Sequence, residues 1–378
     1  MENCKTIELT ITPKYISDWD FGDAVRELVQ NGIDQQTIDP SNKFEISYDA
    51  DEETLRLTNP KSALEINTLL LGCSSKSNNK ETVGQFGEGY KIAALVLNRL
   101  GKTFTVYNYS KNETWISKFE DSATFKEKVL VFKIYSQPTY EKGLTIEIEN
   151  VDESEYKSLY EVWLGMPGSV EHEKIETQYG DIFTDEEMRG KVFVNGLAVE
   201  SNSGKYFGYN FKPEYITLER DRKSCNSWDM SKVTGNMIIE AMKAGEIEAK
   251  DVLNICNEDS FSDISYLQYA TWRSDVRYLS DMLVKEFDSQ YRDAIPVSSQ
   301  SDYDKVKNMG GKPVIVPYYI SQIVASETNS RIATLAENVW GGDFTIKQKL
   351  EQWRDFYEEE IPTEALDQLN KILNMMEQ

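Results

Sequence analysis

The sequence is short of the residues that metal clusters and disulfide frameworks require. Its 378 residues include a single histidine, His172, and four cysteines, none of which lie in a CxxC spacing. A zinc cluster needs several Cys or His ligands at close spacing, and a disulfide framework needs a regular set of paired cysteines. Both classes of protein are therefore excluded, and this cysteine usage is typical of a reducing cytoplasm.

Long apolar runs and positive charge are also scarce. No stretch approaches the roughly 18 to 20 apolar residues of a membrane span, and the N-terminal residues lack the charged-then-apolar layout of a signal peptide. We therefore expect a soluble, cytoplasmic protein without a membrane partner. Lys and Arg number 41 against 64 Asp and Glu, which gives a formal net charge of −23. A field of that sign repels nucleic acid and disfavours it as a partner.

What the chain does contain is enough apolar sequence for several cores, because 40% of its residues are hydrophobic. A chain of this length is expected to form two or three domains. The pattern predicts an N-terminal α+β domain over 1–165, a smaller α+β domain over 166–245 and a mainly helical domain over 246–378.

Apolar periodicity predicts the elements of the N-terminal domain. A helical stripe covers 20–36, with Asp20 as its cap, and a second helix covers 88–101 and ends at Gly101. Period-two alternation predicts a first strand at 6–12, a hairpin formed by 43–50 and 54–59, and a meander formed by 103–109, 114–119, 128–135 and 144–151. A short helix is expected near 63–72. These elements predict helices that cover one face of a mostly antiparallel sheet.

Further along the chain the signals are more widely spaced. Asn-Gly between two alternating runs predicts a hairpin over 191–201. A helix is expected over 229–245 and a buried strand over 312–320, and amphipathic helices are expected to close the chain over 347–360 and 365–377.

A row of polar residues lies within the first predicted helix. Glu27, Asn31 and Asp34, in "ELVQNGID", stand at i, i+4 and i+7 and share one helix face. Spacing alone favours a solvated face, and a functional site is the alternative.

A glycine cluster follows at "VGQFGEGYK". Gly84, Gly87 and Gly89 come after a polar loop at 73–82 and lead into the second helix. Glycines permit close backbone approach, and the free N–H groups at a helix start bind anions, so a phosphate chain and a plain tight turn are the two interpretations. The spacing GxxGxG is neither a P-loop nor a dinucleotide fingerprint.

Together the two motifs resemble the GHKL superfamily of ATP-binding domains, which includes gyrase B, MutL, the ninety-kilodalton heat-shock chaperones, MORC proteins and histidine kinases. "ELVQNGID" is similar to that family's N-box, E-x-x-x-N-x-x-D. "LGCSSKSNNKETVGQFGEGYKIAALV" is similar to the lid and second glycine box of the chaperones. The resemblance covers about residues 5 to 165 and implies a Bergerat-type α/β sandwich, an antiparallel-rich mixed sheet with helices on one face.

The resemblance also implies roles for individual residues. Glu27 would be the general base that activates water, Asn31 would coordinate Mg²⁺, and backbone N–H groups in the glycine box would hold the phosphates of ATP. Lys76 and Lys91 are the candidate charge partners, although a lysine near a helix start is more often solvated. The full set of implied nucleotide-binding residues is Asn31, Asp34, Asn59, Ser75, Lys76, Gly84, Gln85, Phe86, Gly87, Glu88, Gly89 and Lys91.

The sequence departs from the family at the first glycine box. Asn59 stands at the usual adenine-binding Asp, and Lys61 and Ala63 replace two glycines. Two readings stay open: an ATPase that uses lid closure to rearrange its other domains, and a nucleotide-gated binding protein with little hydrolysis.

A chaperone-like client binder is a further alternative for the output of the protein. Nucleotide, an unidentified protein partner and an ATP-dependent homodimer are the expected interactions. In the middle segment Arg220, Arg222 and Lys223 are candidate γ-phosphate sensors, and a charged surface turn is the competing interpretation.

Overall fold

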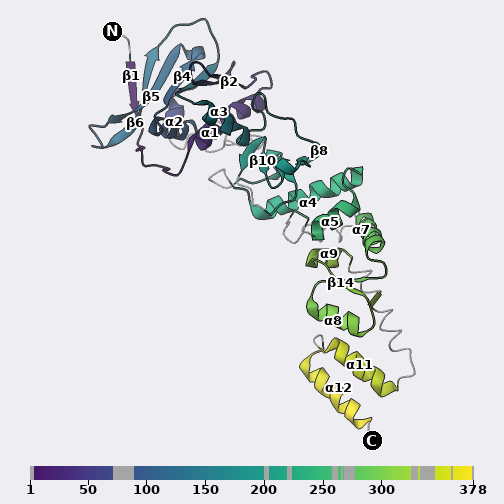
Figure 1. Ribbon diagram of the computed structural model, residues 1–378. Helices are drawn as coiled ribbons and strands as arrows, with labels where there is room; N and C mark the ends of the chain where they lie inside the picture. The colour runs from purple at the N-terminus through teal and green to yellow at the C-terminus, as the bar shows by residue number, and fades with distance from the viewer. Residues whose placement is uncertain are drawn as a thin grey trace. The chain divides into compact units, whose positions relative to one another are not determined.

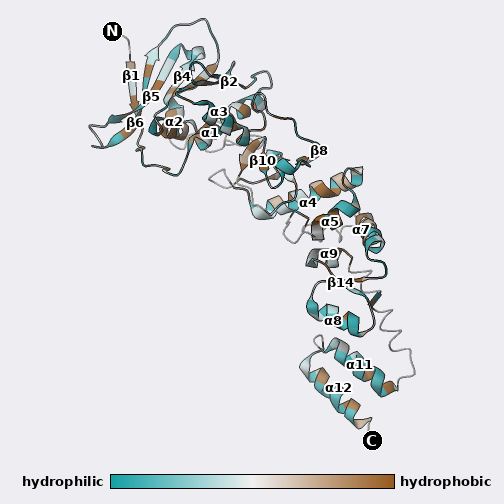
Figure 2. Cartoon of the chain, viewed as in Figure 1, coloured by the Kyte–Doolittle hydropathy of each residue, from teal (hydrophilic) through white to brown (hydrophobic). Residues whose placement is uncertain are grey.

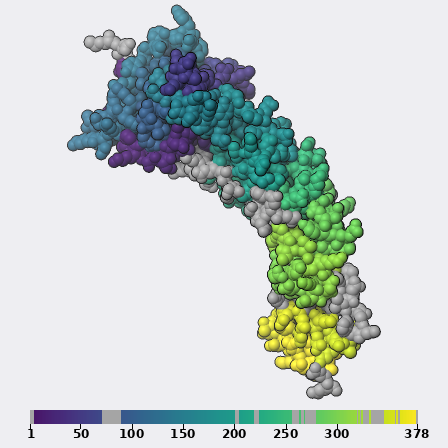
Figure 3. Space-filling model, in the orientation of Figure 1, coloured from purple at the N-terminus to yellow at the C-terminus, as the bar shows by residue number. Residues whose placement is uncertain are grey.

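The computed structural model describes residues 4–70, 89–199, 204–218, 224–257, 263–264, 267, 277–324, 331–332, 345–358 and 361–376. The chain divides into two compact units, the first formed by residues 1–203 and 207–230 and the second by 204–206 and 231–378. In the space-filling view the first unit runs from purple to teal and the second from green to yellow (Figure 3). The predicted division at residue 165 and the three-domain scheme stay predictions.

The first unit is built on a seven-stranded sheet in the order β1-β6-β5-β4-β7-β3-β2, with every neighbouring pair antiparallel (Figure 1). This confirms the predicted α+β class and its antiparallel sheet. The strands are β1 (Cys4–Glu8), β2 (Glu45–Asp49), β3 (Thr54–Asn59), β4 (Thr103–Asn108), β5 (Glu113–Asp121), β6 (Lys128–Ser136) and β7 (Leu144–Glu149).

The predicted meander is correct for β4, β5 and β6 and wrong for β7. The chain returns after β6 and places β7 between β4 and β3, with Ile146 opposite both Val106 and Leu57. The alternating pattern of 144–151 predicts a strand but says nothing about its neighbours. The central position gives β7 a hydrogen-bonded strand on each side.

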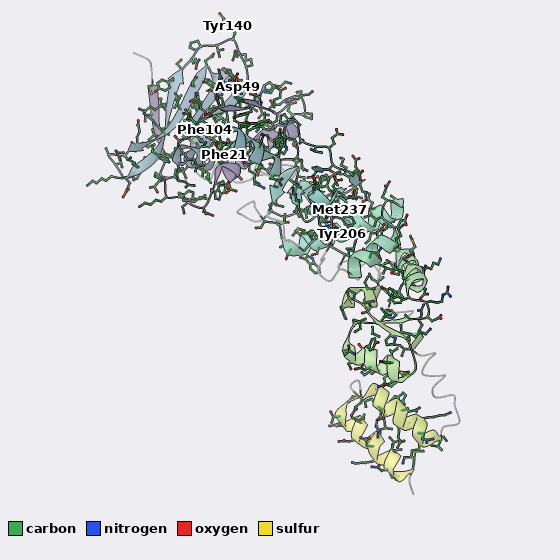
Figure 4. The ribbon with its side chains drawn as sticks, viewed as in Figure 1. Phe21, Asp49, Phe104, Tyr140, Tyr206 and Met237 are labelled. Atoms are coloured by element: carbon green, nitrogen blue, oxygen red, sulfur yellow. The ribbon has the colours of Figure 1, made fainter. Side chains whose placement is uncertain are left out.

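Helices α1 (Phe21–Ile38) and α2 (Gly89–Arg99) pack against each other and against the same sheet, as the sequence predicts (Figure 1). Both helices contribute apolar side chains to the core, and those of α2 can be followed in Figure 2. Phe21 and Phe104 lie in this core, whereas Tyr140, in the connection between β6 and β7, is fully exposed (Figure 4). The remaining short helices of this part are η1 (Ile66–Leu69), η2 (Tyr109–Lys111), α3 (Glu153–Ser158) and η3 (Leu159–Glu161).

A second sheet completes the first unit, in the order β11-β10-β12-β9-β8. Its hairpin confirms the Asn-Gly prediction, because Asn195 and Gly196 both have positive φ between paired strands. The elements are β8 (Lys174–Thr177), β9 (Gly180–Phe183), η4 (Glu186–Met188), β10 (Val192–Val194), β11 (Leu197–Val199), β12 (Gly208–Phe211) and η5 (Pro213–Tyr215).

The second unit is mainly helical, as predicted. The division between the units falls within α4 (Ser227–Ala244), after Met230. The expected buried strand over 312–320 is wrong in extent: β14 has three residues, none of them buried, and a helix begins at Tyr318. The elements are α5 (Ala249–Asn257), α7 (Arg277–Gln290), β13 (Ile295–Val297), α8 (Gln300–Asn308), β14 (Pro313–Ile315), α9 (Tyr318–Ile323), α11 (Ile346–Tyr357) and α12 (Thr363–Met375). No helix in the described ranges is long and apolar enough to cross a membrane.

Candidate functional site

The start of α1 is fixed by a reciprocal cap. Asp20 Oδ1 accepts from the N–H of Asp23 at 2.9 Å, and Asp23 Oδ2 accepts from the N–H of Asp20 at 3.1 Å. Each carboxylate satisfies a backbone donor that the first helical turn leaves without a partner. The predicted cap at Asp20 is confirmed, and it sets the rotational phase of every side chain that follows along α1.

Glu27 and Asp34, the two ends of the polar row of α1, are buried. The exposed fractions are 2% for Glu27, 0% for Asp34, 1% for Gln30 and 6% for Arg26, and Asn31 is partly exposed. Spacing alone favoured a solvated helix face, and that interpretation is wrong. Ionised and amide side chains are seldom buried without a compensating interaction, because their desolvation costs several kcal/mol. A row of them inside a domain is therefore a candidate site.

Asn31 has its carboxamide oriented by the helix itself. Its Nδ2 donates to the carbonyl oxygen of Glu27 at 2.9 Å, one turn earlier. Because the amide nitrogen is the donor in that bond, the oxygen is the group that Asn31 can offer to a cation. Magnesium prefers such hard oxygen ligands and takes few of them from protein. Asn31 therefore fits the magnesium role that its motif implies.

Glu27 lies beside a guanidinium that also contacts the second sheet. Arg26 Nη1 is 3.6 Å from Glu27 Oε1, and Arg26 Nε donates to the carbonyl oxygen of Ala198 at 2.9 Å. Ala198 lies in β11, whose neighbour Leu197 is part of the core formed by α1 and the large sheet. The candidate base is thus next to a side chain that joins α1 to β11.

Asn59, at the end of β3, is held in one orientation by two backbone carbonyls. Its Nδ2 donates to the oxygens of Gly32 at 3.2 Å and Asn42 at 3.3 Å. Asn42 is itself buried, and its Oδ1 accepts from the N–H of Lys61 at 2.8 Å. No donor from the described residues reaches Asn59 Oδ1. Asn59 therefore presents a carbonyl-type acceptor at this position.

Lys61 and Ala63, which stand where the resemblance leads us to expect glycines, are both exposed. Neither has a positive φ angle. The loop after β3 therefore has a backbone that residues other than glycine adopt without strain.

The first turn of α2 forms hydrogen bonds with η1 and with the residue that follows it. The Lys91 ammonium is fully buried and donates to the carbonyl oxygens of Thr68 at 2.8 Å and Leu70 at 2.6 Å. The hydroxyl of Tyr90 lies 2.8 Å from Thr68 Oγ1, and burial raises the pKa of Tyr90, which keeps that hydroxyl protonated. Lys91 is therefore not a solvated lysine. Its role toward phosphate stays a prediction.

Several predicted residues lie outside the described ranges. Gly89 is described, as the buried first residue of α2. Glu27, Asn31 and Asp34 lie on α1, and Asn59, at the end of β3, contacts the same helix at the Gly32 carbonyl. The predicted residues outside the described ranges are Ser75, Lys76, Gly84, Gln85, Phe86, Gly87, Glu88, Arg220, Arg222 and Lys223.

Sequence reasoning missed three residues: Arg26, Gln30 and Asn42. Arg26 and Gln30 are separated by one helical turn and border the predicted row, so the spacing that identified Glu27 and Asp34 could have included them. Asn42 has no such signal, because its partner Asn59 lies in another element. The single histidine, His172, has its Nδ1 3.0 Å from Asp185 Oδ2.

Comparison with known proteins gives distant similarities. No family model matches this chain. An uncharacterised protein of Mycoplasma pneumoniae (strain ATCC 29342 / M129 / Subtype 1) is 23% identical over 219 residues, which cover 55% of this chain and 87% of that protein.

Two solved structures are also similar. The ATPase region of Saccharomyces cerevisiae topoisomerase II bound to ICRF-187 is 14% identical, with a TM-score of 0.33, over 47% of this chain and 62% of that one. The ATPase and transducer domains of topoisomerase II from Balamuthia mandrillaris are 16% identical, with a TM-score of 0.24, over 40% and 45%. This chain spans less than two thirds of either topoisomerase chain.

Proposed function

We propose that this protein binds and hydrolyses ATP with Mg²⁺ at a GHKL-type site. The observation that carries the proposal is the burial of Glu27 and Asp34, with Asn31 between them, on one face of α1. These residues match the sequence pattern of the N-box, and a helix that only faced solvent would have no reason to bury two of them. The second glycine motif precedes α2, which packs beside α1.

In this proposal Glu27 takes the proton of the attacking water, and its carboxylate stays close to the Arg26 guanidinium throughout. Asn31 would hold Mg²⁺, which would supply neutralisation of the phosphate charge. Asn59 accepts a hydrogen bond from the exocyclic amine of adenine. The backbone N–H groups from Gln85 to Gly89 hold the phosphates.

Replacement of Glu27 by Gln tests the hydrolytic step. The amide keeps the size of the side chain but cannot accept the water's proton, so we expect turnover to fall by about 10² to 10⁴, the usual contribution of a general base. Nucleotide affinity should be retained. Phosphate release and calorimetric binding should be measured for wild type, Glu27→Gln and a control, Glu45→Gln, which changes an exposed carboxylate on β2.

Unchanged turnover in Glu27→Gln would remove Glu27 from the reaction. A wild type that binds nucleotide without turnover would instead favour a nucleotide-gated binding protein. The observation behind that second candidate is Asn59, which stands where the family's aspartate is expected.

The output of nucleotide binding is a further part of the proposal. Residues 73–82, which lie outside the described ranges, are proposed to close over ATP. This closure would change the arrangement of the remaining domains, the binding of a protein partner or the formation of a homodimer. Hydrogen exchange over 73–82 should slow when Mg²⁺ and a non-hydrolysable ATP analogue are added, and it should slow less with ADP. Equal exchange rates without nucleotide, with the ATP analogue and with ADP would contradict a closing lid.

A further inference from the structure

Gln30 is a buried carboxamide without a hydrogen-bond partner among the residues that the structure describes. It is 1% exposed, and neither Oε1 nor Nε2 is hydrogen-bonded to any of the described residues. A buried amide that forms no hydrogen bond costs roughly 1 to 3 kcal/mol, and most buried polar groups in proteins are paired. A group of this kind therefore calls for a ligand, a water molecule or a reaction that satisfies it.

The position of Gln30 on α1 identifies the site it belongs to. It stands three residues after Glu27, four after Arg26 and four before Asp34, and side chains at these spacings are neighbours on a helix surface. All three neighbours are charged and buried. Gln30 is thus a neutral side chain among three charged ones, and it forms no hydrogen bond with any of them.

A carboxamide has the chemistry needed to hold a water molecule next to a base. Its oxygen can accept a hydrogen bond from a water molecule, and its NH₂ can donate one to the lone pair of the same water. The carboxamide itself neither gains nor loses a proton. Phosphoryl-transfer enzymes use a glutamine in this way to orient the attacking water. A glutamate in the same place would compete with Glu27 for the water's proton.

We propose that Gln30 is a positioning residue that orients the attacking water beside Glu27. This inference rests on the proposed hydrolysis of ATP. In that step the water oxygen bonds to the γ-phosphorus, the bond from the γ-phosphorus to the β–γ bridging oxygen breaks, and ADP leaves. The water's proton passes to Glu27. The unsatisfied carboxamide is then explained, because its partner is the water that the reaction consumes.

Replacement of Gln30 by Leu separates this role from a structural one. Leu has a similar size and no polar atoms, so it removes the unsatisfied group without opening a large cavity. The matched control is Asn108→Leu. Asn108 is also fully buried, but its carboxamide is bonded at both ends to Leu64, through Nδ2 to the carbonyl oxygen at 2.8 Å and through Oδ1 from the N–H at 3.3 Å.

Thermal unfolding without nucleotide is the first readout, and it does not depend on activity. We expect the unfolding midpoint of Gln30→Leu to equal or exceed that of wild type, and that of Asn108→Leu to be lower. Steady-state hydrolysis is the second readout. We expect kcat of Gln30→Leu to fall by roughly 10²-fold, the effect of removing one oriented hydrogen-bonding group, with little change in KM.

Two results would overturn the role of Gln30 and leave the proposed ATP hydrolysis intact. Turnover equal to wild type would show that Gln30 has no part in the reaction, and a midpoint as low as that of Asn108→Leu would show a structural role. Loss of turnover in Glu27→Gln but not in Gln30→Leu would retain the proposed function and reject the role of Gln30. A wild type that neither binds nor hydrolyses ATP would reject the proposed function and the inference together.

Discussion

At the scale of single residues, hydrogen bonds determine which polar atom each amide can present to a ligand. Asn31 and Asn59 both use the amide nitrogen to donate to backbone carbonyls, in α1 and at the end of β3. In each case the oxygen is the atom that can bind a ligand. These three bonds therefore fix the donor and acceptor pattern that the two amides would present to the proposed nucleotide.

The orientation of Asn59 predicts base selectivity. In the proposed site an acceptor at this position would form a hydrogen bond with the exocyclic amine of adenine, and hypoxanthine has a carbonyl oxygen in place of that amine. We expect ITP to bind more weakly than ATP by about 1 kcal/mol or more, the net value of one neutral hydrogen bond. Calorimetric titration of the wild type with both nucleotides and Mg²⁺ measures the difference. Equal affinities would show that Asn59 does not bind the base through an acceptor.

At the scale of elements, the second sheet is joined to α1 through β11. Ala198 uses both of its backbone groups outside its own sheet, since its N–H donates to the Val162 carbonyl at 2.9 Å and its carbonyl accepts from Arg26. Leu197 belongs to the core of the large sheet. The strand is therefore held in the first unit by main-chain bonds, by packing and by one guanidinium that also lies beside Glu27.

Removal of that guanidinium should be costly. Arg26→Met keeps a long apolar side chain but takes the positive charge away from a buried carboxylate and the donor away from Ala198 O. We expect the free energy of unfolding to fall by about 3 to 5 kcal/mol, as when one partner of a buried ion pair is removed, and turnover to fall with it.

The control for Arg26→Met is Arg56→Met. Arg56 is partly exposed and pairs with Glu52 and Glu147. Its loss should cost about 0 to 1 kcal/mol, the usual value of a surface pair. Urea denaturation measures both variants. Equal losses of unfolding free energy in the two variants would contradict a special role for the contact between α1 and β11.

The elements also show how far the sequence predicts this fold. Local patterns were sufficient for α1 and its cap at Asp20, for α2, which ends at Arg99, just before Gly101, and for the hairpin at Asn195 and Gly196. The insertion of β7 between β4 and β3 could not be predicted, because pairing depends on residues that are distant in sequence.

The candidate site was also only partly predictable from the sequence. The spacing of Glu27, Asn31 and Asp34 gives a shared helix face, but spacing cannot distinguish a buried face from a solvated one. The packing of Gln30 and the support of Asn59 by Asn42 depend on tertiary structure. Sequence therefore identified the row, and the structure identified its neighbours.

At the scale of the whole molecule, the net charge of −23 opposes the binding of any polyanion. A triphosphate would enter a strongly acidic protein at a site that also contains Glu27 and Asp34. The free energy of binding must then come from a cation and from oriented N–H groups. We therefore expect the affinity for ATP to depend strongly on Mg²⁺.

The most direct test of the central claim is calorimetric titration with a non-hydrolysable ATP analogue, with Mg²⁺ and with excess chelator. Three proteins are compared: wild type, Asn31→Ala and a control, Asn308→Ala, which changes an exposed residue of α8 in the second unit. We predict one binding site in wild type and in the control with Mg²⁺, and no measurable binding with chelator or in a folded Asn31→Ala protein. Binding that is unchanged by chelator and by Asn31→Ala, or no binding to the folded wild type, would contradict the account.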